Sequence, residues 1–537
     1  MAHTDQLLIS KLYEFGRLVH SRSEVITHYG TKSTTFTFAE TGVRIGKLAN
    51  ALDKLGIKPG DNIATFGMNS QTQLECYLAI PSMGAILQTL NTKFYSEQLS
   101  YILQEGKNKI IIFDAKLADL LYESKKSFSP DLVLIAAGEC SNSNLSDVLD
   151  YESIIANENS EFDWPLLDER EPAVICYTTG TTGEPKGIVY SHRTIYLHSV
   201  AMATASNMGI TAKDTALVCV PMFHALAWGL TYTMWAEGAN MILPYDNIQP
   251  KSLLKFFETN RPTFALGVPT ILKDILNYVK DDTLDLSFVR YILSGGSAVP
   301  KKLIETFRSK CNTRIVQVYG STESLMCSIS FPPSYAKEDE EIEWLSQTGT
   351  LVAGIDFRVV DPNGKPLPHD GTSAGEFEVK GPWVITSYLN GKDPHKFHDG
   401  WFRMGDLGTC DAEGHVQIAD RIKDLIKSGG EWISSIELEN SLLQNEFINE
   451  TSVIGIPDEQ WEERPLVFVV MKNETEFDPN GLASWLKPKF AKWQIPEYWV
   501  KVDNIPRTSV GKVDKKQLRK LYSEDKLQIS VVDKSTI

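Results

Sequence analysis

Strand-like apolar stretches alternate with amphipathic helical stretches along much of this chain of 537 residues. The apolar runs predict strands at residues 62–66, 109–113, 173–177, 216–220, 290–293 and 314–320, and helices around 252–259 and 301–308. Thr37 and Glu40 form a predicted capping box, followed by apolar residues at helical spacing. Alternation of this kind is typical of layered structures with largely parallel sheets, so we predict an α/β fold.

The pattern changes after about residue 355 to short strands and turns, with DPNG at 361–364 as a predicted hairpin turn. The chain is also longer than a single core usually allows. We therefore expect a large N-terminal domain of two layered α/β subdomains plus a small β-rich subdomain, over residues 1–420. A hinge at 421–423 and a small, mobile α+β domain at 424–537 complete the prediction.

Glycine and threonine dominate the segment 177–187, YTTGTTGEPKG, which follows the apolar run at 173–176. Glycines let backbone amides turn toward an anion, threonine hydroxyls add donors, and Lys186 adds a positive charge. The GKS or GKT order of the common nucleotidases is missing. Taken alone, the segment could also be an ordinary tight turn. Its composition favours a loop that binds a polyphosphate.

This string resembles the phosphate loop of the AMP-forming acyl-CoA synthetases, a family that also contains firefly-type luciferases and the adenylation domains of peptide synthetases. The resemblance continues in order from about residue 37 to residue 518. It implies that ATP, Mg²⁺ and coenzyme A are the cofactor and co-substrates. The nucleotide-binding residues it implies are Thr178, Thr179, Gly180, Thr181, Thr182, Gly183, Lys186, Gly295, Gly296, Ser297, Tyr319, Gly320, Ser321, Thr322, Glu323, Asp406 and Arg421.

The same resemblance assigns roles to several of these residues. The small residues of SGGSAVP, 294–300, would admit the adenine, on which Tyr319 would stack. Thr322 would hold a phosphate, and Glu323 would coordinate Mg²⁺, which prefers oxygen ligands. Asp406 and Arg421 would hold the ribose. The motif around Asp406 reads WFRMGDLG, with Met where the family commonly has Thr.

Lys512, in PRTSVGK, matches the catalytic lysine that the family carries near its C-terminus. Its charge can offset the charge that develops when a carboxylate attacks the α-phosphate. Thr178, Lys186, Glu323 and Lys512 are the expected catalytic residues. The reaction implied is formation of acyl-AMP and pyrophosphate, followed by displacement of AMP by a thiol.

The resemblance also implies two arrangements of the C-terminal domain, one for each half-reaction. Lys423 falls at the family's hinge position. Lys512 would serve the first half-reaction. In the second, a thiol tunnel would be lined by Ser428, Gly429, Gly430, Glu431 and Trp432.

The segment PMFHALAWG, 221–229, matches the family's acid-side segment, with His224, Trp228 and Gly229 as implied substrate contacts. His224 would border the carboxylate. Relatives that activate amino acids usually have an Asp here, so its absence favours a simple carboxylic acid. Trp228 resembles the gate residue of bacterial fatty-acyl-CoA synthetases, which implies a fatty acid. Methylthiopropionate–CoA ligases share much of the pattern and remain the alternative.

Two other classes stay open behind the acyl-CoA ligase. A luciferase-like oxygenase would share all the nucleotide motifs. A non-catalytic relative would be expected to have lost Lys512 or Glu323, and both are present. A peptide-synthetase module is disfavoured because the 25 residues that follow Lys512 leave no room for a carrier domain.

Charge and cysteine content restrict partners and compartment. With 53 basic and 69 acidic residues, the net charge of −16 argues against nucleic acid. Seven scattered cysteines predict reduced thiols and a cytoplasmic protein. The uncharged run at 216–236 is long enough to span a bilayer, but its Pro, His and Gly favour a buried strand, turn and helix. We therefore expect no integral membrane segment, and leave peripheral membrane contact and a homodimer open.

Overall fold

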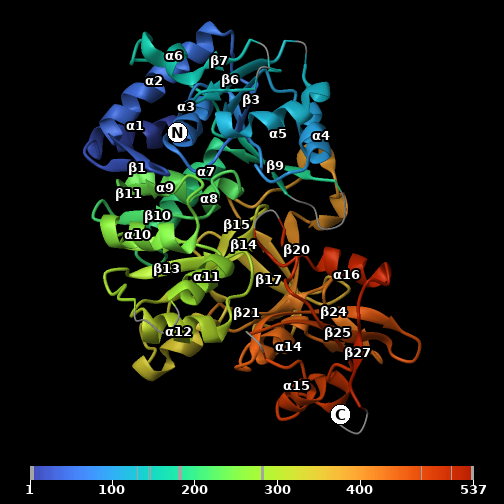
Figure 1. Ribbon diagram of the computed structural model, residues 1–537. Helices are drawn as coiled ribbons and strands as arrows, with labels where there is room; N and C mark the ends of the chain where they lie inside the picture. Colours follow the sequence, from blue (N-terminus) through green and yellow to red (C-terminus); the bar gives the residue numbers. More distant parts are fainter. Residues whose placement is uncertain are drawn as a thin grey trace.

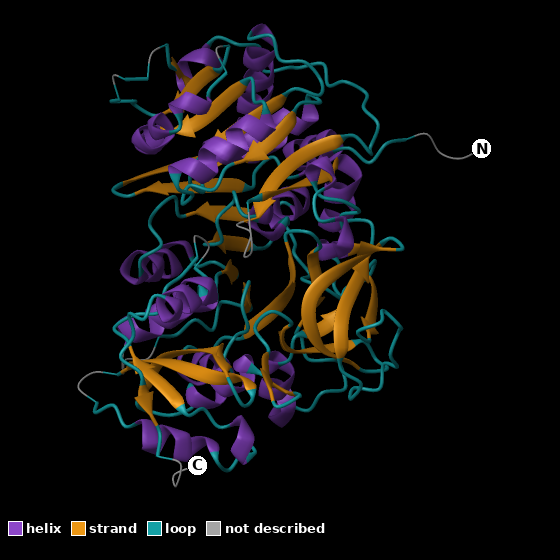
Figure 2. Ribbon diagram, turned by 90° about the vertical axis from the view of Figure 1, so that its right-hand side faces the viewer, coloured by secondary structure: helices purple, strands orange, loops and turns teal. Residues whose placement is uncertain are grey.

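Three β-sheets and the helices that cover them make up the part of the chain that the structure describes (Figure 1). This computed structural model describes residues 5–129, 131–142, 144–145, 147–178, 184–279, 284–472, 475–508 and 511–533. Two sheets lie in the N-terminal portion and the third lies in the C-terminal portion, so the predicted α/β architecture is confirmed. Figure 2 shows the third sheet near the C-terminus, below the strands of the other two.

The first sheet has the strand order β7-β6-β5-β3-β4-β8-β9. All neighbours are parallel except β8 and β9, which are antiparallel. Its strands are β3 (Asn62–Phe66), β4 (Ile86–Thr89), β5 (Ile110–Asp114), β6 (Val133–Ala137), β7 (Leu149–Asp150), β8 (Pro172–Thr178) and β9 (Lys186–Ser191). Thr178 pairs with Lys186, so the two ends of the predicted phosphate loop are held side by side.

The second sheet begins as a parallel sheet and continues into an antiparallel one. Its order is β17-β18-β20-β21-β16-β15-β14-β13-β12-β10-β11-β1-β2, and the strands from β14 to β1 are parallel. The parallel half contains β1 (Glu24–Tyr29), β10 (Thr215–Val218), β11 (Asn240–Leu243), β12 (Phe264–Leu266), β13 (Tyr291–Gly295) and β14 (Ile315–Ser321), and β2 (Lys32–Thr37) pairs antiparallel with β1 at its outer edge.

The antiparallel half corresponds to the predicted β-rich subdomain. It contains β15 (Leu325–Ile329), β16 (Gly349–Leu351), β17 (Asp356–Val360), β18 (Gly375–Lys380), β19 (Phe397–His398), β20 (Trp401–Cys410) and β21 (His415–Arg421). Because β15 pairs with both β14 and β16, this region extends the second sheet and starts before residue 355. The predicted turn at 361–364 is present, and the Gly364 amide donates to the Asp361 carbonyl at 2.9 Å.

The third sheet belongs to the C-terminal portion. It contains β22 (Ile426–Ser428), β23 (Glu431–Ile433), β24 (Ile448–Asp458), β25 (Glu462–Met471), β26 (Tyr498–Lys501) and β27 (Ser530–Val531). Its apolar residues form clusters of their own, whereas one large cluster extends from Ile9 to Val416 and joins the first two sheets. The core of the molecule therefore divides between residues 416 and 426, close to the predicted hinge.

Helices cover the faces of all three sheets (Figure 1). Those of the N-terminal portion are α1 (Ile9–Val19), α2 (Phe38–Lys54), α3 (Gln71–Ser82), α4 (Ser96–Gly106), α5 (Ala118–Glu123), α6 (Tyr151–Ala156), α7 (His192–Ala203), α8 (Ala225–Trp228), α9 (Leu230–Glu237), α10 (Pro250–Asn260), α11 (Pro269–Val279), α12 (Lys301–Lys310) and α13 (Glu341–Ser346). Those of the C-terminal portion are α14 (Ser435–Leu442), α15 (Pro479–Leu486) and α16 (Lys515–Ser523).

Two local predictions from the sequence are confirmed. The Thr37 hydroxyl accepts from the Glu40 amide at 3.1 Å, and the Glu40 carboxylate accepts from the Thr37 amide at 2.8 Å, so the capping box starts α2. The uncharged run at 216–236 forms strand β10, a turn, and helices α8 and α9. Within the described ranges, no helix has both the length and the apolar character needed to cross a bilayer.

Candidate active site

A cleft of about 3020 Å³ lies where the first two sheets meet the C-terminal portion. Its lining comes from the ends of β8 and β14, from β20 and β21, and from the chain before and within α16. The predicted site residues that line it are Thr178, Lys186, His224, Trp228, Gly296, Ser297, Tyr319, Gly320, Ser321, Thr322, Glu323, Asp406, Arg421, Lys423 and Lys512. The fold thus brings most of the separate sequence motifs to one surface.

Asp406 sits between Tyr319 and Arg421 in the cleft wall. The Tyr319 hydroxyl donates to Asp406 Oδ2 at 2.8 Å, and Arg421 Nε lies 3.2 Å from Asp406 Oδ1. The antiparallel register of β20 and β21 places Asp406 directly opposite Arg421. Asp406 is the main reason that the pKa of Arg421 is raised. Two donors hold this nearly buried carboxylate in place, and each of its oxygens keeps a second lone pair with which it could accept from a ligand hydroxyl group.

Glu323 is held by Tyr388, a residue that the sequence motifs did not single out. The Tyr388 hydroxyl donates to Glu323 Oε1 at 2.8 Å, and the Ile385 amide donates to the Glu323 carbonyl at 2.9 Å. Tyr190 donates to the Thr322 carbonyl. These contacts fix YGSTE where β14 turns into β15. Nothing in the sequence around Tyr388 signals this role, because the pairing depends on a long-range contact.

Lys186 meets the same segment from the other side. Its ammonium lies 5.2 Å from the centroid of the Tyr388 ring and pairs with Asp393. Burial lowers the pKa of Lys186. Asp393, which also escaped the sequence analysis, has a left-handed backbone with φ of 46°. The Asp393 carboxylate already pairs with the Lys186 ammonium, so an anionic ligand that binds Lys186 would compete with Asp393.

Lys512 reaches the cleft from a tight turn of the C-terminal portion. The Lys512 carbonyl accepts from the Thr508 amide at 2.7 Å, and Gly511 takes a left-handed φ of 82°. A Cβ added to Gly296 would lie only 3.1 Å from Lys512 Cε, so the second glycine of SGGSAVP leaves the space that the lysine uses. Lys512 therefore approaches the second sheet at the segment that sequence reasoning assigned to the nucleotide.

The charged residues of the cleft lie close enough to shift one another's pKa. Burial lowers the pKa of Lys512 to about 8, with Arg421 lowering it further and Asp406 and Glu323 raising it. Burial, with a smaller contribution from Lys512, lowers the pKa of His224 to about 3. At neutral pH the cleft therefore presents a charged lysine beside a neutral imidazole.

Helix α8, in the segment that the sequence analysis assigned to the acid, is wound left-handed. Ala225, Leu226, Ala227 and Trp228 have φ of 45°, 60°, 50° and 61°, and Gly229 follows with 75°. L-residues adopt this conformation at a cost of about 1–2 kcal/mol each, and rarely in succession. Residue types do not predict this conformation, since alanine and leucine favour right-handed helices.

Some predicted site residues lie away from the cleft. Gly229 and Gly295 are buried behind its wall, where Gly229 packs on the His198 ring and Gly295 packs on Val318. The Ser428–Trp432 segment forms the β22–β23 hairpin, in which the Gly429 amide donates to the Trp461 carbonyl at 2.8 Å, and it does not line the cleft. Thr179, Gly180, Thr181, Thr182 and Gly183 lie outside the described residues.

Polar contacts join the C-terminal portion to β21 across residues 421–423. Asp420 Oδ2 accepts from the Ser435 amide at 2.5 Å and from the Ser435 hydroxyl at 2.7 Å, at the start of α14. Arg519 pairs with Asp424 at 2.7 Å and donates to the Lys423 carbonyl at 3.2 Å. Burial lowers the pKa of Lys423 to about 8.

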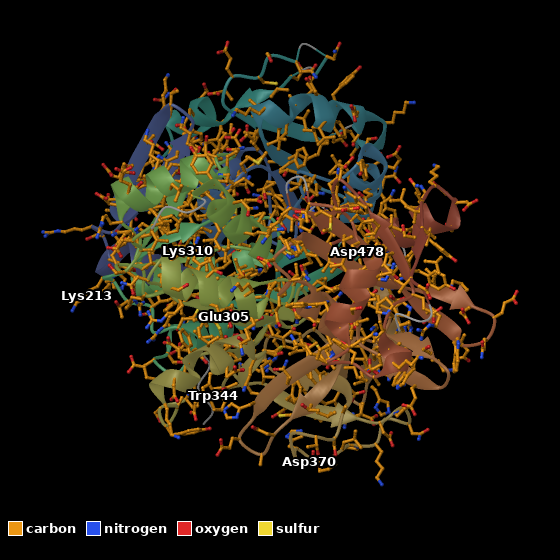
Figure 3. The ribbon with its side chains drawn as sticks, turned by 60° about the horizontal axis from the view of Figure 1, so that its bottom comes forward. Lys213, Glu305, Lys310, Trp344, Asp370 and Asp478 are labelled. Atoms are coloured by element: carbon orange, nitrogen blue, oxygen red, sulfur yellow. The ribbon has the colours of Figure 1, made fainter. Side chains whose placement is uncertain are left out.

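The two portions also face each other across a smaller groove between α12 and α15. Figure 3 labels Glu305 and Lys310 on α12, and Asp478 at the start of α15.

Comparisons with known proteins agree with this geometry. The profile of the AMP-binding enzyme family matches residues 19–389, and that of the AMP-binding enzyme C-terminal domain matches residues 437–512. The 3-methylmercaptopropionyl-CoA ligase of Ruegeria lacuscaerulensis is 35% identical, over 97% of this chain and 98% of its own. The long-chain-fatty-acid–CoA ligase of Thermus thermophilus is 37% identical, over 96% of each chain. The crystal structure of ATP-bound MatB from Rhodopseudomonas palustris superposes with a TM-score of 0.84 at 25% identity, over 97% of this chain and 100% of that one.

Proposed function

The chain belongs to the AMP-binding enzyme family, and we propose that it activates a fatty acid with ATP and transfers the acyl group to coenzyme A. The general class of its reaction is that of an adenylate-forming acyl-CoA ligase. Acyl-CoA, AMP and pyrophosphate are the products.

The observation that carries this proposal is the convergence of Lys512 with the nucleotide motifs in one cleft. Lys512 comes from the C-terminal portion, whereas Glu323, Asp406 and Arg421 come from the N-terminal portion, and these three residues all shift the pKa of that lysine. Burial of a lysine beside the Arg421 cation does not stabilise the fold, because both burial and Arg421 disfavour the charged form of Lys512. A lysine that must meet a developing negative charge requires such a position.

The first half-reaction needs the carboxylate, the α-phosphate and the adenosine held in line. Asp406 and Arg421 would hold the ribose, Tyr319 the adenine, and Thr178 and Lys186 the distal phosphates. The acid's oxygen forms a bond to the α-phosphorus while the bond to pyrophosphate breaks. Lys512 would keep its hydrogen bonds to the α-phosphate oxygens on which negative charge grows. Neutral His224 would border the acid without repelling Lys512.

Glu323 is the residue that would hold Mg²⁺. One carboxylate is enough because Mg²⁺ keeps several waters and takes its other ligands from substrate phosphates. The described residues include no group of three or more His, Cys, Asp or Glu side chains that could hold a metal. When bound, Mg²⁺ supplies charge neutralisation to the phosphates.

The second half-reaction needs a thiol at the acyl carbon. We propose that rotation at 421–423 moves Lys512 out and brings Ser428, Gly429, Gly430, Glu431 and Trp432 toward the cleft. Gly430 has a φ of 86° and open space where a side chain would stand, which leaves room for a slender pantetheine arm, whereas the Trp461 ring fills the corresponding space at Gly429. The thiol then loses its proton to solvent as its sulfur bonds to the acyl carbon, the bond from that carbon to the phosphate oxygen breaks, and AMP leaves with the bonding electrons.

A fatty acid is favoured by the chemistry of the acid-side wall. His224, Ala225 and Trp228 line the cleft, and the residues from 223 to 235 offer no carboxylate to pair with an amine. Each buried methylene contributes about 0.8 kcal/mol, so the specificity constant should rise with chain length until the pocket ends. The short thioether acid 3-methylmercaptopropionate remains the second candidate, because a relative named for it is 35% identical to this chain.

The deciding experiment measures pyrophosphate release across straight-chain acids from C3 to C16, with 3-methylmercaptopropionate included, in the presence and absence of coenzyme A. We expect the highest kcat/KM at a medium or long chain, with thioester formed only when coenzyme A is added. A maximum at C3–C4, or at 3-methylmercaptopropionate, would overturn the fatty-acid proposal and leave the ligase chemistry intact.

The protein is also proposed to act in the cytoplasm. All seven cysteines are free thiols, and six of them are buried. Free thiols persist in a reducing compartment.

A further inference from the structure

The left-handed turn of α8 is fixed at its entrance by side chains from the first sheet's half of the molecule. Asn69 Oδ1 accepts from the Met222 amide at 2.7 Å, and the Tyr77 hydroxyl donates to the Met222 carbonyl at 2.6 Å. The Thr89 hydroxyl donates to the Phe223 carbonyl at 3.0 Å. All three bonds are buried, so the chain enters the turn with little freedom.

The exit of the turn is fixed as firmly. The Gly229 amide donates to the Ala225 carbonyl at 2.9 Å and to the Leu226 carbonyl at 3.1 Å. The Thr231 hydroxyl donates to the same Leu226 carbonyl at 3.3 Å. The His198 ring fills the space where a Gly229 side chain would stand. Strained backbone persists only where its surroundings determine it in this way, and such segments cluster at ligand sites.

The reversed winding divides the turn into a cleft side and a buried side. Ala225 and Trp228 line the cleft together with His224. Leu226 and Ala227 are completely buried and do not reach it. The backbone of two buried residues therefore determines where the Trp228 side chain stands in the wall.

We propose that this left-handed turn determines which acids the cleft accepts, with Leu226 and Ala227 as positioning residues for Trp228. The proposal rests on the proposed function, because the wall in question is the acid-side wall. Non-glycine residues have only a narrow left-handed region available, so the turn is stiff. A stiff wall discriminates between acids that differ by a methylene, whereas a wall that yields accepts both.

Glycine substitution tests the proposal because glycine accepts positive φ without strain. Ala227→Gly removes one buried methyl group from the left-handed turn. Ala49→Gly removes the same group from the interior of right-handed α2, where Ala49 is also completely buried. Both full-length variants are compared with wild type by thermal unfolding without ligands, and by pyrophosphate release with ATP and straight-chain acids.

We expect the apparent Tm of Ala227→Gly to exceed that of Ala49→Gly by about 2 °C, because only the first substitution relieves strain. In Ala227→Gly the kcat/KM ratio between the best acid and the acid two carbons shorter should fall at least about three-fold, with the KM for ATP unchanged. Ala49→Gly should keep the wild-type ratio.

Two results would overturn the proposal. Equal Tm values in the two variants would mean that the turn stores no strain, and an unchanged acid ratio in Ala227→Gly would mean that it does not determine specificity. If wild type activates none of the acids, the proposed function fails and the specificity role fails with it. The Tm comparison is still informative in that case, so the two failures are distinguishable.

Discussion

Lys512 carries a positive charge into a buried part of the cleft, and its contribution can be separated from that of the rest of the site. Lys512→Ala should lower the rate of acyl-AMP formation by about 10²–10³, as expected for loss of one group that stabilises developing charge. Thioester formation from supplied acyl-AMP should be largely retained. Rapid-quench assays of the two half-reactions measure both rates.

The matched control for this variant is Lys501→Ala, which removes an exposed lysine from β26 in the same portion of the chain. It should leave both half-reactions unchanged. Equal loss of the two half-reactions in Lys512→Ala would contradict a role confined to adenylation.

The lowered pKa of Lys512 also predicts a pH dependence. Burial shifts this pKa down to about 8, so the lysine is charged below that pH and loses its charge as the pH rises through it. The kcat/KM for adenylation should therefore fall above about pH 8, since this constant reports the free enzyme.

Lys423 also has a pKa lowered to about 8, so a variant is needed to assign the transition. In Lys512→Arg the side chain keeps its charge at any accessible pH, and the alkaline fall should disappear from the profile. A fall that persists in this variant would assign the titration to another group.

At the scale of elements, the contact between β21 and α14 should select the arrangement in which Lys512 faces the cleft. Asp420 accepts two bonds from Ser435 and a third from the Ile436 amide at 3.3 Å, where the helix dipole favours an anion. Asp420→Ala removes these bonds, each worth about 1.5–3 kcal/mol when one partner is charged. We expect adenylation to slow at least tenfold relative to thioester formation.

Asp478→Ala is the control for this prediction, because Asp478 is exposed at the start of α15 and faces no residue of the other portion in the described contacts. A ratio of the two half-reactions that stays at the wild-type value in Asp420→Ala would show that the contact does not select between arrangements.

At the scale of the whole molecule, residues 421–423 join two portions with separate cores. Lys423→Pro would restrict rotation there, because proline fixes its own φ and limits the residue before it. Adenylation should survive while transfer to coenzyme A falls. Lys423→Ala keeps the rotation free and should retain both steps. Unchanged transfer in stopped-flow assays of the proline variant would place the hinge elsewhere.

Local structure followed from the sequence more closely than the assembly did. Residues 62–66 were predicted as a strand and form β3 with those bounds, because an apolar run between polar residues suffices to define it. The pairing of β1 with β11, more than 200 positions apart, had no local signal. The motif residues around Glu323, Asp406 and Lys512 were recognisable, whereas Tyr388, Asp393 and the left-handed turn arise from tertiary contacts.

The placement of Lys512 on a separately folded portion makes it a tethered reagent. How often Lys512 occupies the cleft depends on its effective concentration there, which is in the millimolar range for groups joined by short flexible connections. If Lys512 acts as proposed, a ligand that binds both portions would raise that concentration further, and a longer connection after Lys423 would lower it while leaving the Arg421–Asp406 pair in place. Under the proposed roles of Lys512 and of residues 421–423, the rate of the first step would depend partly on the length of this connection.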